Sequence, residues 1–207
     1  MLEQMSDSTS KACQIFLDSM TLNFERWHDG IGYDLEALAQ LDSRERSSIE
    51  KLLIQNLSEQ GDWRDVEALA ALNTPAAREA VDKARFHKKT KVRNYALRTI
   101  IHSRDPGKTN RELDAELEEQ VIQAVMHGNY EIAECMPTLR VRKALLDSVL
   151  VVDREIRVSA AAFLLYICGQ TSEPFDWDQR PFFLRFGQES GGKLKQAWQE
   201  LRRRAGL

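Results

Sequence analysis

Two stretches of the chain decide its fold class. Residues 91–100 read KVRNYALRTI, and residues 155–164 read EIRVSAAAFL. Both place a branched apolar residue before an arginine, an alanine three positions after the arginine, and another apolar residue four positions after the alanine. Apolar residues at intervals of three and four are typical of amphipathic helices. The two stretches therefore predict helices that each bury one face.

Helix start signals also occur earlier in the chain. Asp42 and Glu45 form a capping-box pattern, and Thr74-Pro75 places a cap before a proline at the first helical position. Residues 148–152 read SVLVV, which favours a strand by propensity, but we interpret them as helix because no partner strand is in view. The predicted helices cover about 8–27, 35–41, 43–60, 63–72, 75–84, 90–104, 110–127, one or two helices in 130–151 around Pro137, and 153–168.

Composition and charge limit the classes of protein that the chain can belong to. Its 207 residues carry 29% charged and 43% hydrophobic residues and a net charge of −3, which is typical of a soluble globular chain and argues against a nucleic-acid partner. Three widely separated cysteines give no disulfide framework. The sequence shows no signal peptide and no membrane-spanning run. We expect one all-α domain over 1–207 and a cytoplasmic location.

The arginine-containing elements carry a resemblance to a known family. Val-Arg-x-x-Ala and Asp-x-x-Ile-Arg-x-x-Ala resemble the second helix of HEAT-type repeats, over about 62–168. The two stretches are 64 residues apart, which is not a multiple of the usual repeat of roughly 40–47 residues, so the repeat is degenerate. The resemblance implies an α-solenoid of antiparallel helix pairs. Residues 1–61 then form N-terminal helices outside the repeats.

A second resemblance lies near the C-terminus. Residues 173–186 read EPFDWDQRPFFLRF and look like the closing segment of a group of bacterial HEAT-like proteins associated with toxin–immunity loci. We expect 169–207 to hold an irregular, aromatic-rich cap followed by a last helix, because a helical stack must cover its terminal apolar face. The alternative is that these rings anchor a partner, since tryptophan dominates interface hot spots.

Charge is unevenly distributed. Residues 1–62 and 112–134 each have a net charge of −7, whereas 78–111 carry +8 and 193–207 carry +4. Neighbouring helices can neutralise one another, or an acidic zone can meet a basic partner and speed the encounter. The candidate partner-binding residues are Asp29, Asp34, Glu36, Asp62, Trp63, Asp65, Glu112, Glu116, Glu119, Asp176, Trp177 and Asp178.

The sequence contains no complete catalytic, nucleotide-binding or metal-binding motif. Gly107-Lys108-Thr109 resembles the end of a phosphate-binding loop, but His102 stands where that loop needs its first glycine, and a helix precedes it. The four histidines show no metal-binding spacing. We therefore expect no catalytic residue, no metal, no cofactor and no small-molecule substrate.

The functional expectation is a protein–protein interaction module. The C-terminal resemblance implies an immunity protein that binds one protein partner, a bacterial toxin with a basic face, and occludes its active site. Two alternatives stay open: a scaffold or assembly factor for another cytosolic complex, and an enzyme on the same scaffold, a HEAT-like DNA glycosylase that uses the basic stretch 78–111. The acidic pI argues against the enzyme and against any nucleic-acid partner.

Overall fold

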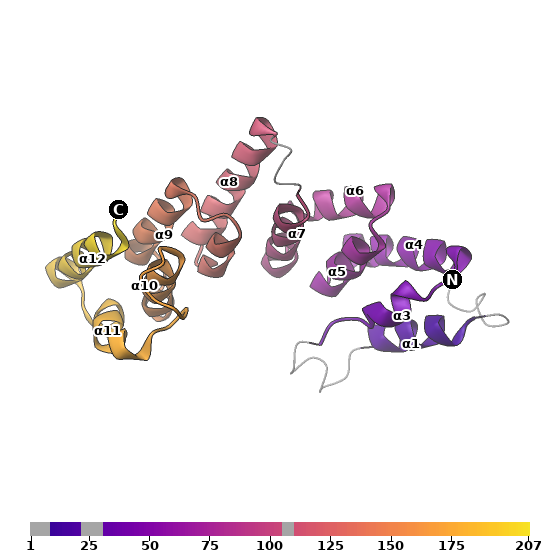
Figure 1. Cartoon of the computed structure of the whole chain (residues 1–207), viewed down its shortest axis with the longest axis horizontal. Helices are drawn as coiled ribbons and strands as arrows, with labels where there is room; N and C mark the ends of the chain where they lie inside the picture. The colour runs from indigo at the N-terminus through magenta and orange to yellow at the C-terminus, as the bar shows by residue number, and fades with distance from the viewer. Residues whose placement is uncertain (1–8, 22–30, 105–109) are drawn as a thin grey trace. The chain divides into compact units, whose positions relative to one another are not determined.

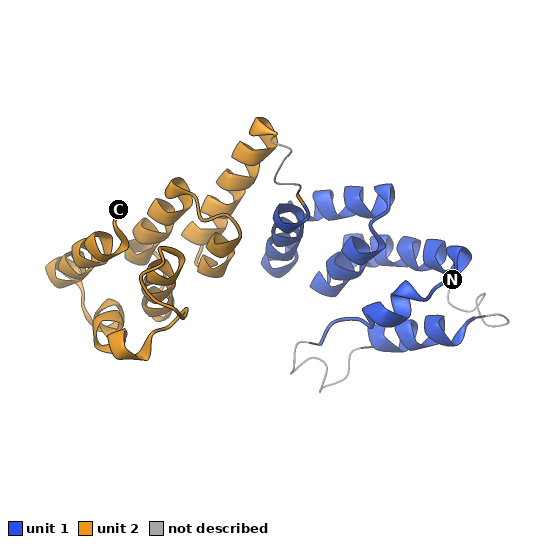
Figure 2. Cartoon of the chain, viewed as in Figure 1, with its two compact units in different colours: residues 1–103 blue, residues 104–207 orange. Residues whose placement is uncertain are grey.

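The computed structural model describes residues 9–21, 31–104 and 110–207, and all regular structure in these ranges is helical. The prediction of an all-α chain is confirmed for this part of the sequence (Figure 1). The chain divides into two compact units, Met1–Ser103 and Arg104–Leu207 (Figure 2). The boundary falls inside the range 62–168 that the sequence analysis treats as one run of repeats. Within the described ranges, no helix has both the length and the apolar character needed to cross a bilayer.

Unit 1 consists of short helices that pack on their neighbours along the chain. In unit 1, α4 packs against α5 and α6, and α5 packs against α6 and α7, while α3 contacts both α1 and α5. The helices are α1 (Lys11–Met20), α3 (Leu35–Ala39), α4 (Ser43–Glu59), α5 (Trp63–Leu72), α6 (Pro75–Ala84) and α7 (Thr90–His102).

A buried carboxylate joins the first helix to α4. Asp42 caps α4 and Glu45 completes the capping box, as the sequence predicts. Glu45 also accepts hydrogen bonds from the backbone N–H of Ser10 (2.7 Å) and from its hydroxyl (2.9 Å), and Ser10 in turn caps α1. One side chain thus satisfies otherwise unpaired donors at the start of two helices.

Unit 2 has the same all-helical construction. Its first helices pack in chain order, and α12 returns to contact α9, α10 and α11. Residues 148–151 are helical, and the stretch around Pro137 divides into a 3-10 helix and an α-helix. The elements are α8 (Arg111–Met126), η2 (Tyr130–Cys135), α9 (Leu139–Val151), α10 (Arg154–Ile167), η3 (Trp177–Gln179), α11 (Arg180–Gln188) and α12 (Gly191–Ala205).

Two predicted boundaries are corrected by the structure. The first helix ends at Met20, where Thr21 is extended, and residues 22–27 lie outside the described ranges. The segment predicted to be irregular contains a regular helix, α11, because Pro181 stands in its first turn, where a missing N–H costs no hydrogen bond.

The two arginines of the aligned stretches make equivalent contacts. Arg93 donates to the carbonyls of His87 (2.9 Å) and Lys88 (3.3 Å), in the turn before α7, and Arg157 donates to the carbonyl of Val152 (3.0 Å), the position before α10 that corresponds to Lys88. Each guanidinium therefore ties the fourth residue of its helix to the chain that enters the helix. The spacing in the sequence reflects this shared role.

Candidate protein-binding surfaces

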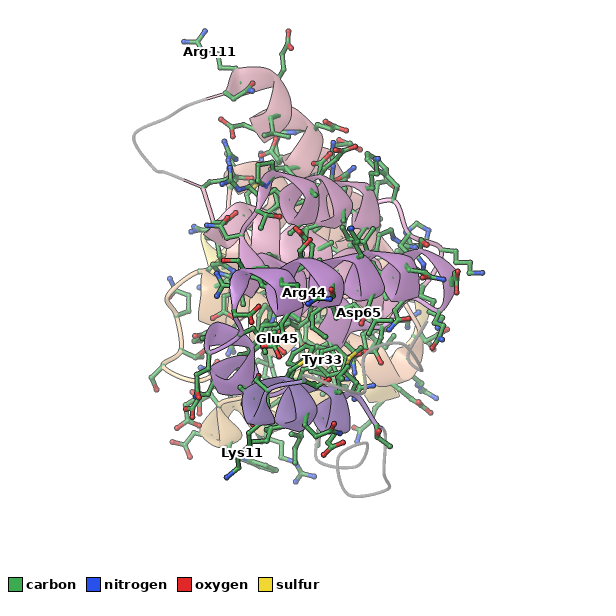
Figure 3. The ribbon with its side chains drawn as sticks, turned by 90° about the vertical axis from the view of Figure 1, so that its right-hand side faces the viewer. Lys11, Tyr33, Arg44, Glu45, Asp65 and Arg111 are labelled. Carbon is green, nitrogen blue, oxygen red and sulfur yellow. The ribbon has the colours of Figure 1, made fainter. Side chains whose placement is uncertain are left out.

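The predicted N-terminal set gathers partly around the start of α5. Asp62 caps α5 by accepting from the backbone N–H of Arg64 (3.0 Å), and it also pairs with the Arg64 guanidinium at 2.6 Å. This pairing outweighs burial and holds the pKa of Asp62 below its usual range. Asp65 is 1% exposed and accepts from the Tyr33 hydroxyl at 2.9 Å. These carboxylates thus make internal contacts (Figure 3 labels Tyr33 and Asp65).

Burial sets the protonation of this network. The lost hydration of Asp65, assisted by the nearby negative charge of Asp62, raises the pKa of Asp65 to about 6. Burial and the Asp65 carboxylate raise the pKa of Tyr33, so its phenol stays protonated as the donor. The Arg64 guanidinium lies 4.8 Å from the centre of the Tyr33 ring and balances part of the negative charge.

Trp63 lies beside this network and is half-buried. Its ring packs on Tyr95 with centroids 5.0 Å apart, and the ammonium of Lys91 lies 4.8 Å from the ring centre. Tyr95 donates to Glu67 at 3.0 Å. Trp63 is therefore held on both α5 and α7 and offers only part of its surface to a partner.

The remaining N-terminal candidates lie at the start of α3 or outside the described residues. Asp34 caps α3 through the backbone N–H of Ala37 (2.8 Å), and Glu36 is exposed in the first turn of the same helix. Asp29 lies outside the described residues.

The acidic helix α8 presents its predicted residues to solvent. Glu112, Glu116 and Glu119 are exposed and follow one another at intervals of four and three, so they share one helix face. Arg140 of α9 pairs with Glu118 and, at 3.1 Å, with Glu119. Part of the negative charge of α8 is thus neutralised within unit 2.

The C-terminal candidates include the most exposed large apolar side chain among the described residues. Trp177 is 69% exposed in η3. Asp176 caps η3 by accepting from the backbone N–H of Asp178 (3.0 Å) and from the side chain of Gln179 (3.1 Å). Asp178 itself is exposed, and the Arg180 guanidinium lies 5.7 Å from the Trp177 ring centre.

A chain of aromatic contacts connects Trp177 to the core of unit 2. Phe175 packs edge-on against Trp177 with centroids 5.3 Å apart, and it contacts the fully buried Phe183 at 5.4 Å. Gln179 accepts from Arg204 of α12 (3.2 Å), which fixes η3 from its other side. The exposed ring is therefore packed on one side against a residue that contacts the core of unit 2.

An apolar groove in unit 1 was not predicted from the sequence. It has a volume of about 290 Å³ and is lined by α4, α6 and the residue His87 that follows α6. We call it the α4/α6 groove. Alanines at intervals of four on α6 could have indicated it, because they leave space beside a neighbouring helix. Its lining residues are Ile54, Leu57, Ser58, Ala76, Glu79, Ala80, Lys83, Ala84 and His87.

In the ranges 9–21, 31–104 and 110–207, no group of three or more His, Cys, Asp or Glu side chains is placed to hold a metal ion. Cys13, Cys135 and Cys168 form no disulfide bond with one another. Compared with known proteins, the chain matches no family model, no curated protein and no solved structure at a significant level.

Proposed function

We propose that the chain acts by binding a protein partner, with Trp177 as the anchor of the interface. The observation that carries this proposal is the combination of high exposure and fixed position in one tryptophan. Burial of a large apolar side chain is worth roughly 1.5–3 kcal/mol, and that energy stays available while the ring faces water. A ring that is already held by Phe175 and η3 loses little conformational freedom on binding.

The charges around Trp177 favour a basic partner surface. Glu173 and Asp178 are exposed on either side of Trp177 in the sequence, and the Arg180 guanidinium lies 5.7 Å from the centre of its ring. A lysine or arginine of the partner can face the exposed tryptophan ring and the flanking carboxylates together.

More specifically, we propose that the partner is a bacterial toxin and that the chain is an immunity protein that occludes it. The support for this form is the resemblance of residues 173–186 to the closing segment of such proteins, together with the anchor in the same segment. A scaffold or assembly factor would use the same anchor without neutralising a toxin. In both forms the chain is a binding protein and not an enzyme.

We also propose that the helices between residues 62 and 168 are HEAT-type repeats that support these surfaces. In unit 1, α5 packs against α6 and α7, and in unit 2, α9 packs against α8 and α10, as neighbouring helices do in a solenoid. The matching contacts of Arg93 and Arg157 support the same proposal.

The experiment is capture followed by co-expression. The full chain and its Trp177→Ala variant are immobilised and exposed to a lysate of the source cells, with Leu139→Ala as the matched control, because Leu139 is another exposed apolar residue of unit 2. We expect one protein to bind the wild-type chain and the control but not Trp177→Ala. Equal capture by all three chains would contradict the assignment of the anchor.

The captured protein is then expressed alone and with the chain. An immunity protein restores the growth of cells that make the captured toxin, and Trp177→Ala fails to restore it. A captured protein that is harmless when expressed alone would contradict the immunity form and leave the scaffold form.

A further inference from the structure

The α4/α6 groove has dimensions that suit a helix of another protein. Ala76 and Ala84 lie eight residues apart on α6, which corresponds to about 12 Å along a helix axis. Two apolar side chains spaced by seven residues on an incoming helix are separated by nearly the same length. The volume of about 290 Å³ is just below the roughly 300–1,000 Å³ of small-molecule sites, so the groove fits a few side chains better than a cofactor.

The groove is apolar at its base and exposed along its edge. Leu57 and Ala84 are buried, whereas Ala76, Glu79 and Lys83 are exposed. Glu79 and Lys83 form an ion pair with each other at 2.7 Å, so this edge carries little net charge. Apolar side chains can therefore enter the groove without burying an unpaired charge of this edge.

The end of the groove at His87 is strongly basic. Residues 83–93, which we call the basic turn, contain six Lys or Arg residues and no Asp or Glu. Asp82 pairs with Arg85 at 3.0 Å, Glu79 pairs with Lys83, and Lys91 acts on the Asp62 carboxylate, which leaves the positive charge of Lys88, Lys89 and Arg93 in excess at this end.

His87 is fixed in position at this end. Gly61 has a φ of +64°, and a Cβ atom there would lie 2.2 Å from the His87 ring. The backbone N–H of Lys89 donates to Nδ1 of His87 (3.1 Å). Burial and the positive charges of Lys88 and Lys89 lower the pKa of the imidazole, which agrees with a positive potential around it.

From the apolar groove and the basic turn at its end, we propose that unit 1 binds an amphipathic helix of a partner protein through the α4/α6 groove. Apolar side chains of that helix, spaced by three, four or seven residues, fill the groove. Acidic side chains beyond them meet Lys88 and its neighbours in the basic turn. The charge of this partner segment is opposite to that of the partner surface expected at Trp177, so the two surfaces recognise different segments. The proposal does not depend on the proposed function at Trp177.

The test uses a displayed library of 16-residue helical peptides, with apolar and charged residues randomised, selected on the immobilised full chain. We expect enriched peptides to carry apolar residues at helical spacing and more Asp and Glu than Lys and Arg. Ala76→Trp fills the groove and is expected to weaken their binding at least about tenfold, as is common when a central contact is lost. Ala71→Trp is the matched control, because Ala71 is exposed on α5 and does not line the groove.

Charge reversal tests whether the basic turn binds the acidic side chains of the peptide. Lys88→Glu is expected to weaken binding about tenfold at low salt, and less at high salt because the interaction is screened. Lys143→Glu, an exposed residue of α9, is the charge-matched control and is expected to leave binding unchanged. Trp177→Ala is also expected to leave it unchanged, which separates this proposal from the proposed function. Thermal unfolding of every variant verifies that it is folded.

Three outcomes would overturn the proposal. One is that no helical peptide is enriched, or that the enriched peptides bind Ala76→Trp as well as the wild-type chain. The second is that the enriched peptides are basic. The third is self-association of the chain in sedimentation experiments that Ala76→Trp abolishes, because the occupant would then be a second copy.

Discussion

The hydroxyl of Tyr33 donates a hydrogen bond of 2.9 Å to Asp65, and only 8% and 1% of these two residues are exposed. The bond joins the chain just before α3 to the first turn of α5 across 32 positions of the sequence. Burial of a charged carboxylate costs hydration free energy, and a neutral hydrogen-bond donor offsets that cost only in part. The stability of unit 1 should therefore depend on the protonation of Asp65.

We predict that unit 1 becomes more stable as the pH falls from above 6 toward 4. The pKa of Asp65 is about 6 in the folded chain and about 3.9 in an unfolded one, so the folded chain binds this proton more tightly. The difference corresponds to at most about 3 kcal/mol. Urea unfolding followed at several pH values measures it.

The Asp65→Asn variant is the control for this pH dependence. Its amide oxygen can still accept from Tyr33, but it carries no charge. We expect the variant to lose the gain in unfolding free energy between pH 6 and 4 and to exceed the wild-type chain in stability at pH 8. The same pH slope in both chains would show that another group is responsible.

We predict that Tyr33→Phe destabilises unit 1 by about 1–3 kcal/mol, because it leaves a buried carboxylate without its donor. The loss of a donor to the charged form also raises the pKa of Asp65 further. The pH range over which the unfolding free energy changes should therefore move to higher pH, which urea titrations of the variant can measure. A variant that is destabilised with no shift of this window would contradict the assigned contact.

We predict that Arg157→Leu lowers the free energy of unfolding by about 1–2 kcal/mol, because it removes the donor to the carbonyl of Val152. Arg111→Leu is the matched control, since Arg111 is exposed at the start of α8 and projects from the surface (Figure 3). Chemical denaturation of both variants provides the comparison. Equal stability of the two would mean that the shared arginine contact contributes nothing.

We predict that Phe175→Ala weakens partner binding although Trp177 remains. The Phe175 ring centroid lies 5.3 Å from that of Trp177. Without this ring the Trp177 indole can occupy several orientations, so it loses more conformational entropy when the partner binds. Titration calorimetry with the captured partner should show a less favourable binding entropy. Trp177→Ala, by contrast, should weaken binding while leaving the thermal midpoint nearly unchanged. An unchanged binding entropy for Phe175→Ala would argue against preorganisation.

The local signals of the sequence predicted the helices well. Asp42 and Thr74 are both N-caps, as their sequence context indicated, because capping depends on residues two or three positions apart. The burial of Asp65 could not be predicted in the same way, because it depends on Tyr33, a partner 32 positions away. Asp65, a candidate surface residue by sequence, is therefore an internal carboxylate in the structure.

The candidate surfaces were only partly predictable. Trp177 stood out by composition, but its fixed position depends on the distant Arg204 of α12 and on the buried Phe183. The α4/α6 groove was missed because it is formed by the space between two helices, and the sequence does not state how closely Leu57 and Ala80 approach each other.

The most direct test of a binding role for Trp177 is photocrosslinking at that position. The residue is replaced by the photoreactive analogue p-benzoylphenylalanine, and living source cells are irradiated, with the same replacement at exposed Lys195 as the control. The account predicts one covalent adduct of defined mass from position 177 and none from position 195. Irradiation that gives no adduct at position 177, or the same adducts at both positions, would contradict it.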